Sequence, residues 1–193
     1  MCRAIIMGMK HIFVALLLVF LSNGPTIAQA CPAAPDHTAA LAGLIGAVQQ
    51  AEDASAAQMI SNQMWSYWAD APDGHAQELL DEGMSRRAAY DYDGAMLAIE
   101  ALIAYCPDYA EGYNQRAFVN FLRGDYAAAL PDLERAVQIS PRHIAAMTGQ
   151  AMTLMALNRN AEAALTLRAA LTLNPWLSER NLLPILEQHE DTL

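Results

Sequence analysis

The stretch AEGYNQRAFVNFLRGDYAAALPDLERAVQISPRH, residues 110–143, decides the fold. It contains two short helical patterns that face each other across Arg123-Gly124-Asp125. The pattern returns 34 residues earlier and 34 residues later. Two small residues and a closing proline recur in phase, and they are Gly83, Ala117 and Ala151; Ala95, Ala129 and Ala163; and Pro107, Pro141 and Pro175. Three positions in phase at one period indicate a tandem repeat.

Simple packing physics explains this pattern. Small residues at Ala117 and Ala129 allow two antiparallel helices to approach closely, while Tyr113 and Leu133 fill the seam between them. Neither helix could bury its apolar face alone. Successive helix pairs must therefore stack into one continuous core.

The repeat resembles the tetratricopeptide repeat (TPR) family. The resemblance implies an all-α fold, a short right-handed solenoid of helix-turn-helix repeats. The three copies occupy residues 76–109, 110–143 and 144–177. Arg116 and Asn120 stand where the family usually has a leucine and an aromatic residue. Pro131 falls inside a predicted helix, where we expect it to kink or loosen the first turns.

Two further helical segments flank the repeats. Residues 37–75 contain two amphipathic patterns, the second of which has Asp53 as its expected N-cap. We interpret them as a degenerate repeat, or as a hairpin that caps the first repeat. Residues 178–193 alternate apolar and charged side chains, which predicts a C-terminal capping helix and tail, with a break in the helix at Pro184.

Residues 1–30 have the three parts of a secretory signal peptide: a positive start, an apolar run from Ile12 to Leu21, and the small-x-small end Ala28-Gln29-Ala30. The run is too short to span a bilayer. We expect cleavage after Ala30, a linker at residues 31–36, and a periplasmic or secreted protein. A retained N-terminal anchor is the alternative.

The mature chain would hold two cysteines, Cys31 and Cys106. An even pair in an exported protein predicts a disulfide. Two free thiols, with Cys106 buried as a small hydrophobe, is one alternative. A lipid anchor on Cys31 is another, although Ala28 and Gln29 fit a lipoprotein motif poorly.

The charge balance excludes several partner classes. The formal charge is −10, and loss of Arg3 and Lys10 with the leader removes two positive charges and leaves −12. An acidic chain without a basic stripe is a poor match for nucleic acid or for an anionic membrane surface. A hydrophobic fraction of 54% argues against disorder.

The sequence contains no motif typical of catalysis. There is no GxSxG, no phosphate-binding glycine loop and no CxxC. None of the four histidines of the mature chain is spaced to share a metal with a cysteine or another histidine, and these are His37, His75, His143 and His189. We therefore predict a protein that is not an enzyme and that needs no metal or other cofactor.

The resemblance implies a concave groove, lined by the first helix of each repeat, that receives a peptide. The groove residues carried over are Leu80, Met84, Arg87, Asn114, Phe118, Phe121, Thr148, Met152 and Met155. Some of these side chains could instead face the core. A subgroup of the family clamps a C-terminal carboxylate with basic residues and asparagines. The corresponding positions here are Leu80, Met84, Ala145 and Gly149, which do not support that activity.

The resulting functional prediction is a protein or peptide binding module that acts as an adaptor or assembly factor in the bacterial cell envelope. Two alternatives stay open. The protein could be an accessory subunit of an envelope enzyme, or it could bind a small molecule or peptidoglycan fragment on Trp65 and Trp68. Two tryptophans three residues apart on a helix are more often part of a core.

Overall fold

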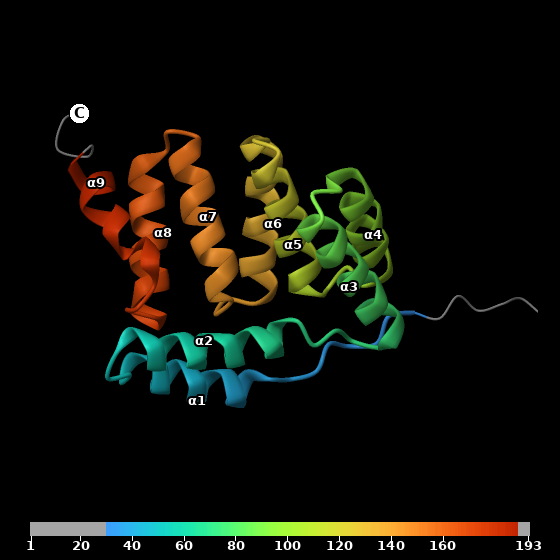
Figure 1. The fold of residues 1–193 in the computed structure, drawn as a ribbon, viewed down its shortest axis with the longest axis horizontal. Helices are drawn as coiled ribbons and strands as arrows, with labels where there is room; N and C mark the ends of the chain where they lie inside the picture. The colour runs from blue at the N-terminus through green and yellow to red at the C-terminus, as the bar shows by residue number, and fades with distance from the viewer. Residues whose placement is uncertain (1–29, 189–193) are drawn as a thin grey trace, which may run out of the picture.

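The computed structural model describes residues 30–188, which form helices joined by short turns (Figure 1). The α-helices are α1 (Thr38–Gln49), α2 (Ala54–Trp68), α3 (Gly74–Ala88), α4 (Tyr92–Tyr105), α5 (Ala110–Leu122), α6 (Tyr126–Ile139), α7 (Ile144–Ala156), α8 (Asn160–Leu173) and α9 (Leu183–Gln188). One 3-10 helix, η1 (Ser178–Leu182), precedes α9. The described residues contain no strand, so the all-α prediction is confirmed.

The helices from α3 to α8 form three antiparallel pairs that stand side by side (Figure 1). The recurring small residues lie where the helices of a pair approach each other. Ala117 and Ala129 are fully buried, and a Cβ atom at Gly83 would lie 2.6 Å from Ile99 Cγ1. Any larger side chain there would force the two helices apart. The predicted stack of close-packed helix pairs is therefore present.

The turn within each pair contains one residue in the left-handed backbone region. These residues are Tyr90, Gly124 and Asn158, with φ values of 63°, 77° and 60°, and they are spaced by the repeat period. Glycine adopts this conformation without strain and asparagine tolerates it, but a tyrosine does not favour it. The turn geometry is thus set by the repeat, and the first repeat adopts it at a conformational cost.

The departures from the family pattern in the second repeat are accommodated locally. Helix α6 runs from Tyr126 to Ile139 through Pro131, so the expected loosening of its first turns is not seen. Arg116, in the place of a leucine, donates two hydrogen bonds to Asp132 at 2.8 and 2.6 Å. This bidentate pair joins α5 to α6 where an apolar contact would otherwise do so.

The α1–α2 hairpin does not continue the stack. It lies across one end of the vertical helices in Figure 1 and packs against Ile144, Leu173 and Trp176. Gln49 Nε2 donates to the carbonyl oxygen of Thr172 at 2.8 Å, although 123 residues separate them. The predicted hairpin exists, but it covers the ends of the second and third repeats instead of forming a further repeat or capping the first.

The described part of the C-terminal cap consists of two short helices, η1 and α9. The break comes at Leu183, where η1 gives way to α9, and Pro184 is the second residue of α9. Proline is tolerated there because the first N–H groups of a helix have no partner within it. Leu186 is buried against α8, so the segment covers the end of the core. Residues 189–193, including His189, lie outside the described part.

The Sγ atoms of Cys31 and Cys106 lie 1.97 Å apart, with their Cα atoms 5.2 Å apart. The contact links the start of the described chain to the end of α4. The predicted signal peptide falls on residues 1–29, which the structure does not describe, and on Ala30. In the described range, no helix is long and apolar enough to cross a membrane.

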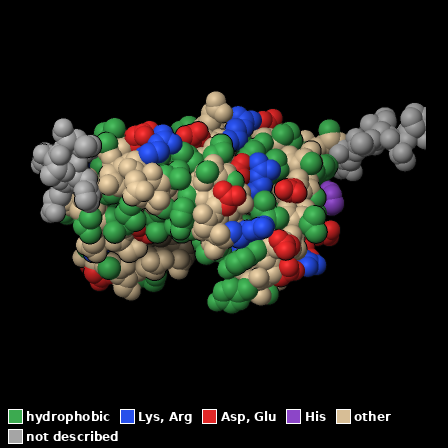
Figure 2. All heavy atoms as spheres, turned by 90° about the horizontal axis from the view of Figure 1, so that it is seen from above, with side chains coloured by type: hydrophobic (Ala, Val, Ile, Leu, Met, Phe, Trp, Pro, Cys, Tyr) green, Lys and Arg blue, Asp and Glu red, His purple; other side chains and the backbone are tan. Residues whose placement is uncertain are grey.

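Charged side chains on the face seen in Figure 2 are interleaved by sign. Arg86 pairs with Glu82 and with Asp91, and Arg159 pairs with Glu162. Exposed pairs of this kind add little stability. On the face seen in Figure 2, the basic side chains stand among acidic and apolar ones and do not gather into one patch.

Candidate functional site

A cavity of about 810 Å³ lies between the α1–α2 hairpin and the repeats. We call it the groove. One wall is α2, the opposite wall is made by α5 and α7 with Arg87 from α3, and residues 174–181 close one end. Its larger apolar lining residues are Trp65, Phe118, Phe121, Met152 and Trp176.

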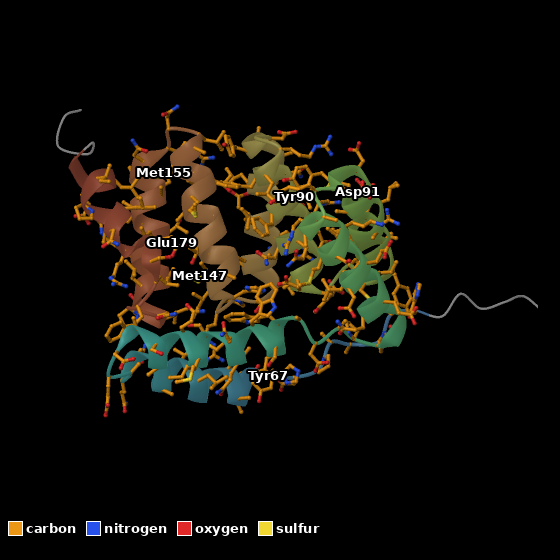
Figure 3. All side chains as sticks on the ribbon, in the orientation of Figure 1. Tyr67, Tyr90, Asp91, Met147, Met155 and Glu179 are labelled. Carbon is orange, nitrogen blue, oxygen red and sulfur yellow. A yellow bond between two sulfur atoms is a disulfide. The ribbon has the colours of Figure 1, made fainter. Side chains whose placement is uncertain are left out.

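The α2 wall follows from the helical period. Asp53 accepts a hydrogen bond from the Ala56 N–H at 2.8 Å and thereby fixes the start of the helix, as predicted. Gln58, Asn62 and Trp65 then follow at spacings of four and three residues, so they share one face of α2 and line the groove. Tyr67 lies on the other side of the hairpin, away from the repeats (Figure 3).

The α5 wall is aromatic. Phe118 keeps 44% of its surface exposed, and the Arg87 guanidinium lies 4.3 Å from the centre of its ring. Phe121, one turn further on, packs edge-on against Tyr126 with ring centres 5.2 Å apart. These contacts fix the two rings while leaving apolar surface open to the groove, as a site for apolar side chains requires.

The α7 wall has few polar groups free to bind a ligand, although Thr148 is one of the predicted groove residues. The Thr148 hydroxyl donates to the carbonyl oxygen of Ile144, so its proton is already used. At Gly149 a Cβ atom would lie 3.0 Å from Leu133 Cδ2. Glycine therefore lets α7 approach α6 closely. Met152, which is only partly buried, provides an adaptable apolar surface beside it.

A buried polar network lies beneath the groove, centred on Glu111. Its carboxylate accepts hydrogen bonds from Asn114 Nδ2 and Gln115 Nε2, and His143 Nε2 lies 2.8 Å from Oε2. His143 Nδ1 accepts the Ala146 N–H at 3.3 Å. The proton of a neutral His143 therefore belongs on Nε2, which donates it to Glu111. These side chains all donate to the Glu111 carboxylate, so its buried oxygens have hydrogen-bond partners.

The hairpin is attached to this network through Trp68. Its indole stacks on the His143 ring with centres 4.6 Å apart and planes 13° from parallel. The Trp68 carbonyl oxygen accepts the Tyr109 hydroxyl at 2.8 Å. Burial raises the pKa of Tyr109 far above its ordinary value, so the hydroxyl stays protonated and remains a donor. The contacts of Trp68 with His143 and Tyr109 thus fix the position of α2 against the repeats.

Arg87 connects the network to the groove. One of its terminal nitrogens donates to Gln115 Oε1, and Gln115 in turn donates to Glu111. Burial lowers the pKa of Arg87, and the nearby Glu111 charge partly opposes that shift. An arginine so placed remains a cation at neutral pH. The groove therefore has a partly desolvated positive charge beside an aromatic wall.

Comparison with known proteins supports the repeat architecture. The tetratricopeptide repeat family model matches residues 121–175. The chain is built on tetratricopeptide repeats. A TPR repeat-containing protein of Rhizobium etli is 31% identical over 117 residues, which are 58% of this chain and 54% of that protein. Tetratricopeptide repeat protein 36 of Mus musculus is 41% identical over 66 residues, 34% of this chain and 36% of that protein. The chain thus spans about half the length of the first relative and about a third of the second.

Solved TPR structures share the fold. The first TPR of Spaghetti (RPAP3), bound to the HSP90 peptide SRMEEVD, has a TM-score of 0.58 and 23% identity. The match covers 60% of this chain and 93% of that chain. The TPR2B domain of yeast Sti1, in its complex with pHsp70, has a TM-score of 0.52 and 25% identity over 60% of this chain and 93% of that chain.

The nine groove residues that the TPR resemblance implied fall into two sets in the structure. Six of them line the groove: Arg87, Asn114, Phe118, Phe121, Thr148 and Met152. Leu80 does not, because it is fully buried in the core of the first repeat, and Met84 packs against the same cluster. Met155 lies at the end of α7 far from the hairpin (Figure 3) and packs against the C-terminal core.

Sequence reasoning missed the part of the site that the TPR pattern does not encode. Gln58 and Asn62 lie in the hairpin, outside the repeats, and only their helical spacing with Trp65 marks them. His143, for which the sequence indicates no role, is fully buried and caps α7. Trp68 is a core residue, as expected, while Trp65 serves both the core and the groove.

The described residues offer no metal centre, since no three His, Cys, Asp or Glu side chains gather in a geometry that could hold an ion. His37 pairs with Asp70 at 2.6 Å, and His75 packs edge-on against Tyr105. These two histidines therefore have structural partners instead of a shared ligand.

Proposed function

We propose that this chain binds a segment of another protein in the groove, without catalysing a reaction. The observation that carries the proposal is the open apolar surface between α2 and the repeats. Trp65, Phe118, Phe121 and Met152 present apolar side chains to a cavity of about 810 Å³. Such a surface is a typical binding site when polar groups lie around it.

The polar groups of the groove suit a peptide backbone. Asn62 and Gln58 on α2 are exposed and face Asn114 on α5 across the groove. Side-chain amides can both donate to and accept from a peptide unit. The Sti1 TPR2B domain, 25% identical, was solved in complex with pHsp70, which supports a peptide or protein partner for the related fold here.

We further propose that the protein works as an adaptor or assembly factor in a bacterial cell envelope. The signal-peptide pattern of residues 1–30 supports export. The proximity of Cys31 and Cys106 supports an oxidising compartment, where such a pair forms a disulfide. Trypsin accessibility of the protein in intact cells and in spheroplasts of a host tests this location.

The binding proposal is tested by selecting partners from a displayed library of random 12-residue peptides on the full chain without its leader. Selected peptides are then compared on the wild type, on Phe121→Asp and on Trp65→Ala, each verified as folded by circular dichroism. Leu97→Asp is the matched control, because Leu97 is 71% exposed on α4 and does not line the groove. We expect binding to be lost with the Phe121 variant, weakened with the Trp65 variant and retained by the control. Equal binding to all four proteins would refute the groove.

A second candidate is the binding of a sugar-containing peptidoglycan fragment, because Trp65 and Trp176 both line the groove. Indole rings stack on the apolar faces of sugars, and such stacking changes tryptophan emission. Titration of muropeptides while emission is followed separates this function from protein binding. An unchanged spectrum up to millimolar ligand would eliminate it.

A further inference from the structure

We propose that the groove selects peptide segments that carry an acidic side chain, and that Arg87 pairs with that side chain. This inference rests on the proposed function, since it names the chemistry of the segment that the groove would bind.

The arginines differ in whether they pair with a carboxylate, and two of the unpaired ones line the groove. Within residues 30–188 all nine cationic side chains, histidines aside, are arginines. Six of these lie within 4.0 Å of a carboxylate oxygen, and they are Arg86, Arg116, Arg123, Arg135, Arg159 and Arg168. The other three have no such pair among the described residues, and they are Arg87, Arg142 and Arg180. Two of these three, Arg87 and Arg180, line the groove.

Of these two arginines, Arg87 is the better placed to bind an anion in the groove. It is only partly exposed, whereas Arg180 is exposed and donates to the carbonyl oxygens of Trp176 and Leu177. The charge of Glu111 acts on Arg87, but Gln115 makes hydrogen bonds to both side chains and so links them indirectly. Asn114, Gln115 and His143 already occupy the Glu111 carboxylate. Arg87 therefore reaches a carboxylate only through an amide.

The guanidinium of Arg87 is held ready for an anion. Phe118 supports one face of it at 4.3 Å, and Gln115 fixes one of its nitrogens. Arg87 itself lines the groove and keeps part of its surface exposed. A fixed, partly desolvated guanidinium binds a carboxylate through charge-assisted hydrogen bonds and loses little conformational freedom in doing so.

The surroundings of Arg87 define the rest of the segment. Phe118 lies beneath the guanidinium and Phe121 follows one turn later, so a large apolar side chain would fit close to the acid. The protein carries a formal charge of −10 and repels acidic chains at long range. Selection of an acid therefore has to come from direct contact with Arg87 in the groove.

The test uses peptides from the display selection whose binding is lost with Phe121→Asp. Each is synthesised with its acidic residues and again with Glu→Gln or Asp→Asn exchanges. Dissociation constants for both forms are measured by fluorescence anisotropy on the wild type, Arg87→Gln, Arg87→Lys and Arg142→Gln. Arg142 is the matched control, because it also lacks a carboxylate partner but does not line the groove.

We expect the wild type and Arg142→Gln to bind the acidic form about 10-fold more tightly than the amide form, as a charge-assisted hydrogen bond predicts. Arg87→Gln should bind both forms equally, and Arg87→Lys should keep part of the preference. Because the preference is a ratio within one protein, a modest loss of stability in a variant does not affect it.

Two results would overturn the inference while leaving the proposed function intact. One is a set of groove-dependent peptides without acidic residues, and the other is a preference for acid that survives in Arg87→Gln. If no selected peptide depends on Phe121, the proposed function itself fails. The two failures are therefore distinguishable.

Discussion

Glu111 Oε2 in α5 and His143 Nε2 at the N-cap of α7 lie 2.8 Å apart, and both side chains are 0% exposed. The pair joins three parts of the molecule, because Gln115 links Glu111 to Arg87 in the groove and Trp68 of the hairpin stacks on His143. A change at Glu111 should therefore affect the fold, the hairpin and the binding surface together.

Replacement of Glu111 by Gln should lower the free energy of unfolding by about 2–4 kcal/mol, since a buried carboxylate with several donors loses its charge and one acceptor oxygen. The amide would also point an N–H group at existing donors such as His143 Nε2 and Asn114 Nδ2. Urea unfolding followed by circular dichroism measures the loss. Glu78→Gln, on the exposed face of α3, is the control and should change stability by less than about 0.5 kcal/mol. Equal effects of the two changes would show that the network adds no stability.

Tyr90→Gly should stabilise the protein by about 0.5–1 kcal/mol, because glycine relieves the strain of a φ of 63°. Tyr90 is 81% exposed, and the only ring it meets among the described residues is that of Tyr92, at 6.3 Å between centres. Little packing is therefore lost. The reverse change, Gly124→Ala at the equivalent turn, should destabilise by a similar amount. A rise in thermal midpoint for the first and a fall for the second check the prediction.

Acid should weaken the fold partly through Asp73. Hydrogen bonds from the Ala76 N–H and then the Tyr105 hydroxyl hold the pKa of Asp73 below its ordinary value of 3.8. The carboxylate therefore contributes stability above the unfolded-state pKa, and this contribution is lost as pH falls through the lower folded-state pKa. Asp73→Asn keeps the helix cap but cannot titrate, so its urea midpoint should fall less than that of the wild type between about pH 5 and about pH 2. Parallel curves would contradict the assignment.

Cys31→Ser should destabilise the protein isolated from an oxidising compartment by at most about 4.5 kcal/mol, the chain-entropy limit for a loop spanning 75 residues. The same change should have no such effect on protein treated with a reductant. Intact mass after alkylation, with and without reduction, shows whether the bridge forms. A mass that reveals two alkylated thiols before reduction, or an acyl group on Cys31, would remove the basis of this prediction.

Much of the fold could be predicted because the repeat encodes it locally. Gly83, Ala117 and Ala151 mark close helix contacts, and Gly124 marks the turn within the second repeat. The docking of the hairpin could not be predicted in the same way. It depends on contacts such as that of Gln49 with Thr172, which lie 123 residues apart and leave no local sequence pattern.

The site was predictable to the extent that it follows the repeat. Phe118, Phe121 and Met152 line the groove at the positions that the family uses. Leu80, at the corresponding face of α3, is instead buried against Leu102 and Cys106 in the core of the first repeat. The family pattern gives the helix face, but it does not show how far the groove extends along the stack.

The hairpin also changes how the stack can come apart. A linear array can fray from one end, because each repeat touches only its neighbours. Here Gln49 and Ser61 in the hairpin are hydrogen-bonded to Thr172 and Asn174 at the far end of the repeats. The last repeat cannot open without breaking these contacts with α1 and α2. We therefore expect the hairpin to dock only after the repeats have formed, and the third repeat to unfold together with the hairpin instead of fraying alone.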